Sequence, residues 1–184
     1  RKEADVLNGP IQFSAGSGMT PEIMAIVQLL TGPKKNYLDT WEYKITWVKG
    51  MSGSERRLAF RRGDLNGTRE NPAAYKKHVL PVIAEGKAFT WFHHGLLNVK
   101  TGKHDKDPNF EEPTFEELYE EMWGVAPEGD FYDAYKLVKS WRDALQKAFW
   151  VNKGNPNKQK LVDALNKMIQ DPESVAAIEK KVGK

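Results

Sequence analysis

The sequence predicts an α/β protein whose sheet is mainly parallel and flanked by helices. Short apolar runs with strand character alternate with longer stretches that have helical spacing of apolar residues. Signals for a helix start follow the first strands directly. Alternating strands and helices require crossover connections, which place successive strands parallel. In such sheets, ligands bind beyond the carboxyl ends of the strands, where the following helices begin.

The first unit is a strand predicted over Pro10–Ala15 and the helix after it. A Gly-Ser-Gly break at 16–18 ends the strand. Thr20 is a hydroxyl N-cap, Pro21 stands at the first helical position, and Glu22 adds negative charge to the first turn. Apolar residues at helical spacing then continue to a Thr-Gly-Pro stop. This unit therefore predicts a helix start at the carboxyl end of the strand.

Two further extended segments are predicted over Tyr43–Val48 and Leu65–Arg69. The first leads into a helix opened by a capping box of Ser52 and Glu55. The second leads into a helix opened by Asn71, and a proline interrupts that helix. Both segments thus repeat the strand-to-helix pattern of the first unit.

The later part of the chain predicts two more strands and four helices. The strands are expected over Ala88–Phe92 and Lys147–Val151, and a polar loop over Leu97–Pro113. A capping box of Thr114 and Glu117 opens the next helix, and a long amphipathic helix follows it. Two helices separated by an Asp-Pro-Glu break close the chain.

Composition excludes several classes of protein. Hydrophobic residues make up 40% of the 184 residues, which suits one substantial folded core. The net charge is only +3 and the basic residues are scattered, so no nucleic-acid partner is expected. The chain has no cysteine, which excludes disulfides, thiolate metal sites and cysteine catalysis. No run approaches the roughly 20 apolar residues of a membrane span, so no membrane insertion is expected.

Small and hydroxylated residues gather at three strand-to-helix junctions. The candidate ligand-binding residues are Ser14, Gly16, Ser17, Gly18 and Thr20 at the first junction, Ser52, Gly53 and Ser54 at the second, and Thr68, Arg69 and Asn71 at the third. Glycines let a ligand approach the backbone, and free N–H groups at helix starts suit a carboxylate or phosphate. Each junction alone is also explained as a plain cap and turn. Three junctions at one sheet edge predict an anion site.

Motifs for catalysis, nucleotides and metals are missing. The glycines are not spaced as a P-loop, and neither Ser17 nor Ser54 lies in Gly-x-Ser-x-Gly. His93 and His94 are adjacent, so on a strand they point to opposite faces and do not readily share one ion. We therefore expect no catalytic residue, no metal and no cofactor.

Three runs carry a family resemblance: "PIQFSAGSGMTPEIMAIVQLLTG", "YKITWVKGMSGSERRLAFRRGDLNGTRENPAAYKK" and "WVNKGNPNKQKLVDALNKMIQDPESVAAIEKK". They resemble the Bug-type substrate-binding receptors of tripartite tricarboxylate transporters. The chain departs from that family at Asn66, where the family generally has aspartate, and at Thr68, where it often has arginine. The stretch Val99–Pro113 does not align with the family.

The resemblance implies a two-lobed α/β clamp of the periplasmic-binding-protein class, type II. Residues 1–70 would then lie mostly in the second lobe, and residues 71–184 would return to the first lobe and add the closing helices. The beginning of the first lobe would be absent from this chain. The implied function is non-enzymatic: a periplasmic receptor captures a small organic anion such as a carboxylate and delivers it to membrane transporter subunits.

Two other functions remain open from the residues alone. One is an α/β enzyme acting on an anionic metabolite, with Glu70 or His93 as acid or base. The other is a sensory or interaction domain that keeps the fold and binds a partner protein.

Overall fold

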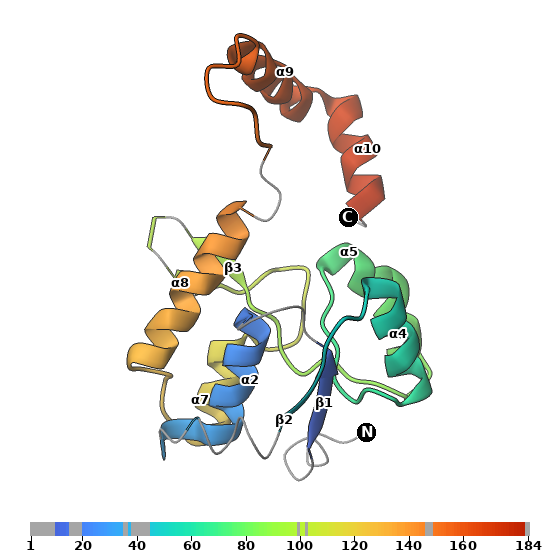
Figure 1. Cartoon of the computed structure of the whole chain (residues 1–184), viewed down its shortest axis with the longest axis vertical. Helices are drawn as coiled ribbons and strands as arrows, with labels where there is room; N and C mark the ends of the chain where they lie inside the picture. Colours follow the sequence, from blue (N-terminus) through green and yellow to red (C-terminus); the bar gives the residue numbers. More distant parts are fainter. Residues whose placement is uncertain are drawn as a thin grey trace.

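The computed structural model describes residues 10–14, 20–34, 37, 45–98, 100–101, 103–145 and 149–182 (Figure 1). Both strands and helices occur, which confirms the mixed α/β class. In chain order the elements are β1 (Ile11–Ser14), α2 (Pro21–Thr31), the 3₁₀ turn η1 (Gly32–Lys34), β2 (Ile45–Val48), α4 (Gly53–Arg62), α5 (Pro72–Ala74), the π-helix η2 (Tyr75–Val79), α6 (Leu80–Ala84), β3 (Leu96–Asn98), β4 (Lys103–Asp105), α7 (Phe115–Trp123), α8 (Asp130–Leu145), α9 (Lys158–Gln170) and α10 (Pro172–Val182).

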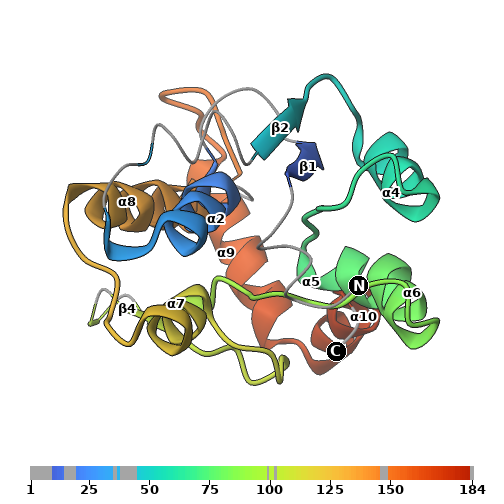
Figure 2. The same cartoon turned by 90° about the horizontal axis from the view of Figure 1, so that it is seen from below.

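The first two predicted strands form a parallel pair in their described parts. β1 and β2 pair with Ile11 opposite Ile45, and they lie side by side in Figure 2. The segment at Gly67 runs parallel beside β1 through a bridge to Phe13. This bridge lies within the predicted extended segment Leu65–Arg69. Three of the predicted extended segments are therefore parallel neighbours.

The side chain of Asn66 fastens the Gly67 segment to β1. Its Nδ2 donates to the carbonyl oxygen of Pro10 at 2.9 Å, and its Oδ1 accepts from the backbone N–H of Gln12 at 2.6 Å. The backbone N–H groups of Asn66 and Gly67 both donate to the Gln12 carbonyl. A side-chain amide therefore extends the pairing of the backbone.

Helix α2 forms the centre of the protein, and each of its residues is buried. Thr20 precedes it in extended conformation and Pro21 is its first residue, as predicted, although the Thr20 side chain makes no capping hydrogen bond. One face of α2 packs against the strands; this cluster comprises Ile11, Phe13, Ile23, Ile26, Val27, Leu30 and Ile45. The other face packs against α7 and α8; that cluster comprises Met24, Ala25, Leu29, Phe115, Leu118, Tyr119 and Tyr135.

The predicted helix caps of α4, α5 and α7 are confirmed. The Ser52–Glu55 and Thr114–Glu117 capping boxes are both complete. Asn71 accepts a hydrogen bond from the backbone N–H of Ala74 at 3.0 Å at the start of α5. The predicted interruption of this helix is also present, as the π-helix η2 that leads into α6. Pro81 lies in the first turn of α6 and has no N–H to continue the α-helical bonding.

Three predictions for the later chain are wrong. Residues 88–92 form no strand; Trp91 and Phe92 pack against the core from irregular backbone, so their aromatic character reflects burial. The predicted polar loop 97–113 contains most of the antiparallel hairpin β3–β4. Residues 149–151 form no strand, while 147 and 148 lie outside the described residues. The described sheet is thus smaller than predicted, with one parallel pair extended by the bridge at Gly67.

Helix α9 lies away from the rest of the protein, and α10 runs back towards α5 (Figure 1). α9 has no buried residue, and it packs on α10, which also contacts α5. Among the described helices, none is both long and apolar enough to cross a lipid bilayer.

Candidate functional site

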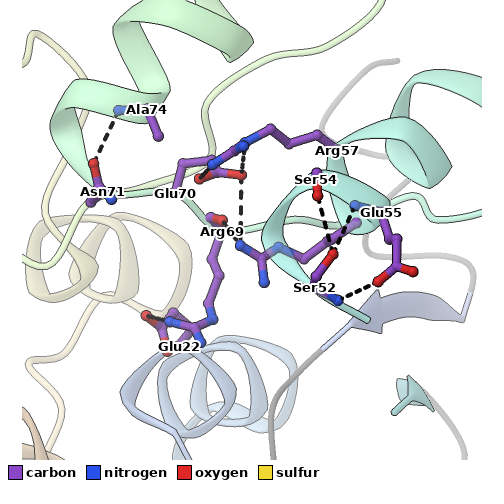
Figure 3. Close-up of polar contacts among 10 residues, drawn as sticks. Glu22, Ser52, Ser54, Glu55, Arg57, Arg69, Glu70, Asn71 and Ala74 are labelled. Carbon is purple, nitrogen blue, oxygen red and sulfur yellow. Dashed lines mark hydrogen bonds and ion pairs between the residues drawn. The ribbon is translucent and has the colours of Figure 1, made fainter. Parts of the chain in front are cut away.

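The carboxyl ends of β1, β2 and the Gly67 segment lie at one edge of the small sheet because the three segments are parallel. Helices α2, α4 and α5 follow these segments (Figure 3). We call this edge the rim, and its described residues are Ser14 at the end of β1, Thr20 before α2, Ser52, Gly53 and Ser54 at the start of α4, and Thr68, Arg69 and Asn71 before α5. The predicted site residues Gly16, Ser17 and Gly18 lie outside the described residues.

The Glu22 carboxylate links the rim to α8. Its Oε1 lies 3.3 Å from Arg69 Nη1, and it also contacts Arg142 Nη1. The Glu22 side chain is 9% exposed, so the carboxylate is largely removed from water. A buried charge requires partners, and the two guanidinium groups provide them.

The pKa of Glu22 reflects these neighbours. Burial alone would raise it, but the positive charges of His94, Arg142 and Arg69 together lower the pKa to about 2. The pKa of His94 is itself lowered to about 3, so this ring is neutral near pH 7. At neutral pH, the two arginines therefore keep Glu22 ionised.

A second buried carboxylate, that of Glu70, connects α4 to the third junction. Arg57 binds it through both oxygens, with Nε–Oε1 at 2.9 Å and Nη2–Oε2 at 3.2 Å. Arg56 Nη2 lies 3.6 Å from the same Oε1 and donates to the carbonyl oxygen of Arg69 at 3.3 Å. Both Glu70 oxygens are therefore engaged, which disfavours Glu70 as a catalytic acid or base.

Some rim side chains serve mainly as helix caps. Ser52 Oγ accepts from the Glu55 N–H at 3.4 Å and lies 3.1 Å from Ser54 Oγ. Asn71 likewise uses its side-chain oxygen to cap α5. For Ser52 and Asn71, the plain capping explanation thus accounts for the observed contacts.

Other rim side chains carry buried polar atoms that lack a partner. At the rim these atoms are Ser14 Oγ, Thr20 Oγ1, Thr68 Oγ1 and Arg69 Nε, and beside it Glu22 Oε2 and Arg56 Nε; elsewhere among the described residues, Trp91, His93, His104 and Glu116 also carry such an atom. Ser14 is 1% exposed, and the bridge between Phe13 and Gly67 places it next to Thr68. A buried polar atom without a partner costs about 1–3 kcal/mol. Such a concentration at one edge is typical of a place where a further polar group binds.

The two adjacent histidines make packing and hydrogen-bond contacts. Burial lowers the pKa of His94, and the nearby Glu22 carboxylate opposes that effect only in part. His94 Nδ1 lies 2.9 Å from the hydroxyl of Tyr135. His93 stacks on Phe110 and accepts from the Gly95 N–H at 3.0 Å. Among the described residues, no group of three or more carboxylate or histidine side chains is placed to hold a metal ion.

The structure contains a cavity of about 460 Å³. It is lined by Tyr37, Glu128, Gly129, Asp130, Phe131 and Ala134. None of the predicted site residues that the structure describes lines this cavity. Its two carboxylates disfavour an anionic ligand there.

Sequence reasoning missed the roles of Glu22 and Arg142. The sequence marks Glu22 only as a favourable charge in the first turn of its helix. Arg142 lies 120 residues further along the chain, in α8, and no local motif marks it as a partner of Glu22.

Comparisons with protein-family models, with curated proteins and with solved structures found no match. The resemblance to Bug-type receptors is therefore carried by the sequence motifs alone.

Proposed function

We propose that this protein binds a small organic anion, such as a carboxylate, at the rim. The observation that carries the proposal is the gathering of guanidinium groups and hydrogen-bond donors around the starts of α2, α4 and α5. At this edge four guanidinium groups contact two buried carboxylates; they belong to Arg56, Arg57, Arg69 and Arg142, and the carboxylates to Glu22 and Glu70. Backbone N–H groups at helix starts add partial positive charge.

The proposed role is that of a periplasmic solute-binding receptor for a tripartite transporter, and its partners are the membrane subunits. The unit of two parallel strands with α2 between them suits one lobe of a type II binding protein. In this proposal, residues 1–70 belong mostly to the second lobe. Residues 71–184 return to the first lobe and provide the closing helices.

The enzyme alternative has less support. Arg57 engages both oxygens of Glu70, and His93 is stacked on Phe110 and bonded to the backbone. Neither residue is free to accept a proton from a substrate without losing these contacts. An anion receptor needs no such residue, which is why we prefer it.

Thermal unfolding with a panel of anions tests the proposal. The panel comprises propionate, succinate, citrate and inorganic phosphate, because a ligand that binds only the native state raises the melting temperature. We expect at least one carboxylate to raise it in proportion to the logarithm of its concentration. If no anion in the panel shifts the melting temperature, the receptor function is wrong.

A matched pair of threonine variants then locates the site. Thr68→Val removes a buried hydroxyl that lacks a partner, so it should leave the unliganded stability nearly unchanged. It should weaken binding of the active carboxylate about tenfold in titration calorimetry. Thr101→Val, in the exposed turn of the β3–β4 hairpin, is the control and should leave affinity unchanged. Equal effects of the two variants would contradict a site at the rim.

A further inference from the structure

Helix α9 carries an apolar face that remains largely open to solvent. The face comprises Leu161, Val162, Leu165, Met168 and Ile169, which recur at helical spacing. α10 packs on this helix, and Leu165 in the middle of the face is half-buried. The other four residues are exposed. In Figure 1, α9 lies away from the strands and from α2 and α7, so the core does not cover this face.

Exposed apolar residues continue on both sides of the helix. Phe149 and Trp150, in the segment that leads to α9, are 82% and 78% exposed, and Ile178 of α10 is 40% exposed. With the exposed residues of α9 they present roughly 800 Å² of surface, at about 150–250 Å² for each fully exposed residue of this size. A stable interface between two proteins buries about 800 Å² per partner. Residues 149–182, which we call the arm, thus expose enough apolar surface for a dimer.

The apolar pattern of α9 is symmetric about Leu165. Read from either end of the helix, the apolar positions have the same spacing. When two copies of α9 lie antiparallel with their Leu165 residues opposite each other, Leu161 faces Ile169 of the other copy. Val162 then faces Met168 in the same way. A two-fold interface requires a surface that is complementary to itself, and this pattern meets that requirement.

The charges at the two ends of α9 also suit an antiparallel pair. Lys158 and Lys160 lie in its first turn, whereas Asp171 and Glu173 follow its last turn. Antiparallel copies bring the basic end of one helix to the acidic end of the other, and charges beside an apolar seam determine the orientation of paired helices. Parallel copies would instead place like charges side by side.

We propose that the arm is a docking surface for a second copy of this chain, with the two α9 helices antiparallel about Leu165. The proposal is independent of anion binding at the rim. A contact of this area without a buried core of its own belongs to the weaker specific interfaces, with a dissociation constant in the micromolar range. In solutions far more dilute than that, the arm is solvated and its side chains contribute little to the stability of the chain.

The polar face of α9 favours a second copy over a membrane surface. Exposed tryptophan and lysine residues also suit an anionic lipid surface, but helices that lie on such membranes carry mainly lysine and arginine on their polar face. On α9, Asp163 lies on that face together with Lys160 and Lys167. The charge is therefore mixed, as an interface between two identical chains requires.

Sedimentation velocity of the full chain from about 1 to about 200 µM tests the proposal, because the dimer fraction rises with concentration. We expect a monomer at the lowest concentration and a dimer at the highest. Leu161→Lys should weaken the dimer about a hundredfold or more, since each dimer contains the substitution twice. Leu58→Lys, on α4, is the matched control and should leave the dimer unchanged, because Leu58 is 48% exposed and Leu161 46%.

Three results of this experiment would overturn the proposal: a monomer at every concentration, a dimer that Leu161→Lys leaves intact, or equal weakening by both lysine variants. Vesicles of phosphatidylglycerol distinguish the lipid alternative in the same samples. Binding of the chain to these vesicles, without a dimer in solution, would assign the arm to a lipid surface and would also overturn the proposal.

Disulfide formation between two cysteine variants tests the antiparallel arrangement. The chain has no cysteine of its own, so any link comes from the introduced residues. A mixture of Leu161→Cys and Ile169→Cys copies should form a linked dimer on oxidation, because these positions face each other across the two-fold axis. Neither variant alone should link, since its two thiols lie about 12 Å apart along the helices. Links in the separate samples, or no link in the mixture, would overturn the antiparallel contact.

Discussion

Helices α2 and α9 have similar lengths and opposite environments. α2 has 11 residues and all are buried, whereas α9 has 13 residues and none is buried. Both carry apolar residues at helical spacing, so spacing alone does not distinguish them. α2 lies between the parallel strands and two helices, whereas α9 packs on α10 and has no buried residue. The comparison shows that the surrounding elements decide whether an apolar face is covered.

The apolar stripe of α9 is consequently accessible. Leu161 is 46% exposed and Ile169 is 61% exposed. Just before the helix, Phe149 and Trp150 are 82% and 78% exposed. The centre of the protein and its last two helices should therefore respond very differently to the same substitution.

A pair of leucine substitutions should show the largest difference. Leu29→Ala removes a side chain that is 0% exposed between α2 and α7, and it should lower the free energy of unfolding by about 3 kcal/mol. Leu161→Ala on α9 should lower it by less than about 0.5 kcal/mol. Urea denaturation measures both. Similar losses would mean that α9 is packed as tightly as α2.

A pair of glycine substitutions should show the next largest difference. Gly32 ends α2 with φ of 61°, and an added Cβ would lie 2.5 Å from the Trp123 ring. That ring is fixed by a hydrogen bond from its Nε1 to the Leu29 carbonyl at 3.1 Å, so Gly32→Ala should cost about 2–3 kcal/mol. Gly154 also has positive φ, but nothing lies near its Cβ position, so Gly154→Ala should cost only about 1 kcal/mol. Thermal unfolding measures both losses. The Gly154→Ala variant reports the cost of positive φ alone, and the additional loss in Gly32→Ala reports the clash with Trp123.

Acid should weaken the centre of the protein through His94. Burial lowers the pKa of His94 from 6.5 to about 3. Between these two pH values, His94 is therefore protonated in the unfolded chain and neutral in the folded protein. The free energy of unfolding is unaffected above the pKa of His94 in the unfolded chain, 6.5. It decreases as the pH falls from 6.5 towards 3, and the decrease is about 2 kcal/mol at about pH 5. In urea denaturation at about pH 7 and pH 5, His94→Gln should remove most of this loss.

The matched variant for that experiment is His78→Gln, which alters a histidine of the π-helix η2. It should keep the acid sensitivity of the unmodified protein. An unfolding free energy that is the same at both pH values in the unmodified protein would show that His94 is not buried as a neutral ring.

The smallest expected difference concerns two helix starts. Thr114 is the N-cap residue in the capping box of α7 and is 4% exposed. Thr114→Ala should therefore lower the free energy of unfolding by about 1 kcal/mol. Asn157 precedes α9 without a capping hydrogen bond from its side chain, and Asn157→Ala should have almost no effect. Chemical denaturation measures both costs, and a clear loss on Asn157→Ala would contradict this description of α9.

Local signals predicted most of the helix starts correctly. The pairs Ser52–Glu55 and Thr114–Glu117 form the expected capping boxes, because the interacting atoms lie within one helical turn. The hairpin β3–β4 was missed because its turn depends on Asn98, whose side chain accepts from the backbone N–H groups at 100 and 101 within a stretch that is polar throughout.

The candidate site was predictable only where local chemistry determines it. Helix starts at the ends of parallel strands were expected from the alternation of elements, and Thr20, Ser52 and Arg69 do lie at such positions. The contact of Glu22 with Arg142 depends on how α8 packs against α2, which no spacing in the sequence records. The ion pairs of Glu22 therefore emerge only from the tertiary structure.

Asn66 makes the contact between β1 and its neighbour depend on an uncharged amide. The residue donates to the Pro10 carbonyl and accepts from the Gln12 N–H, so it needs both polarities at once. Aspartate has the same size but, when ionised, would turn a negative oxygen towards that carbonyl. Only its protonated form could replace the missing donor. With Asn66→Asp, the side-chain hydrogen bonds between this segment and β1 would thus depend on pH. Both would form at acidic pH, and the bond to the Pro10 carbonyl would be lost towards neutral pH.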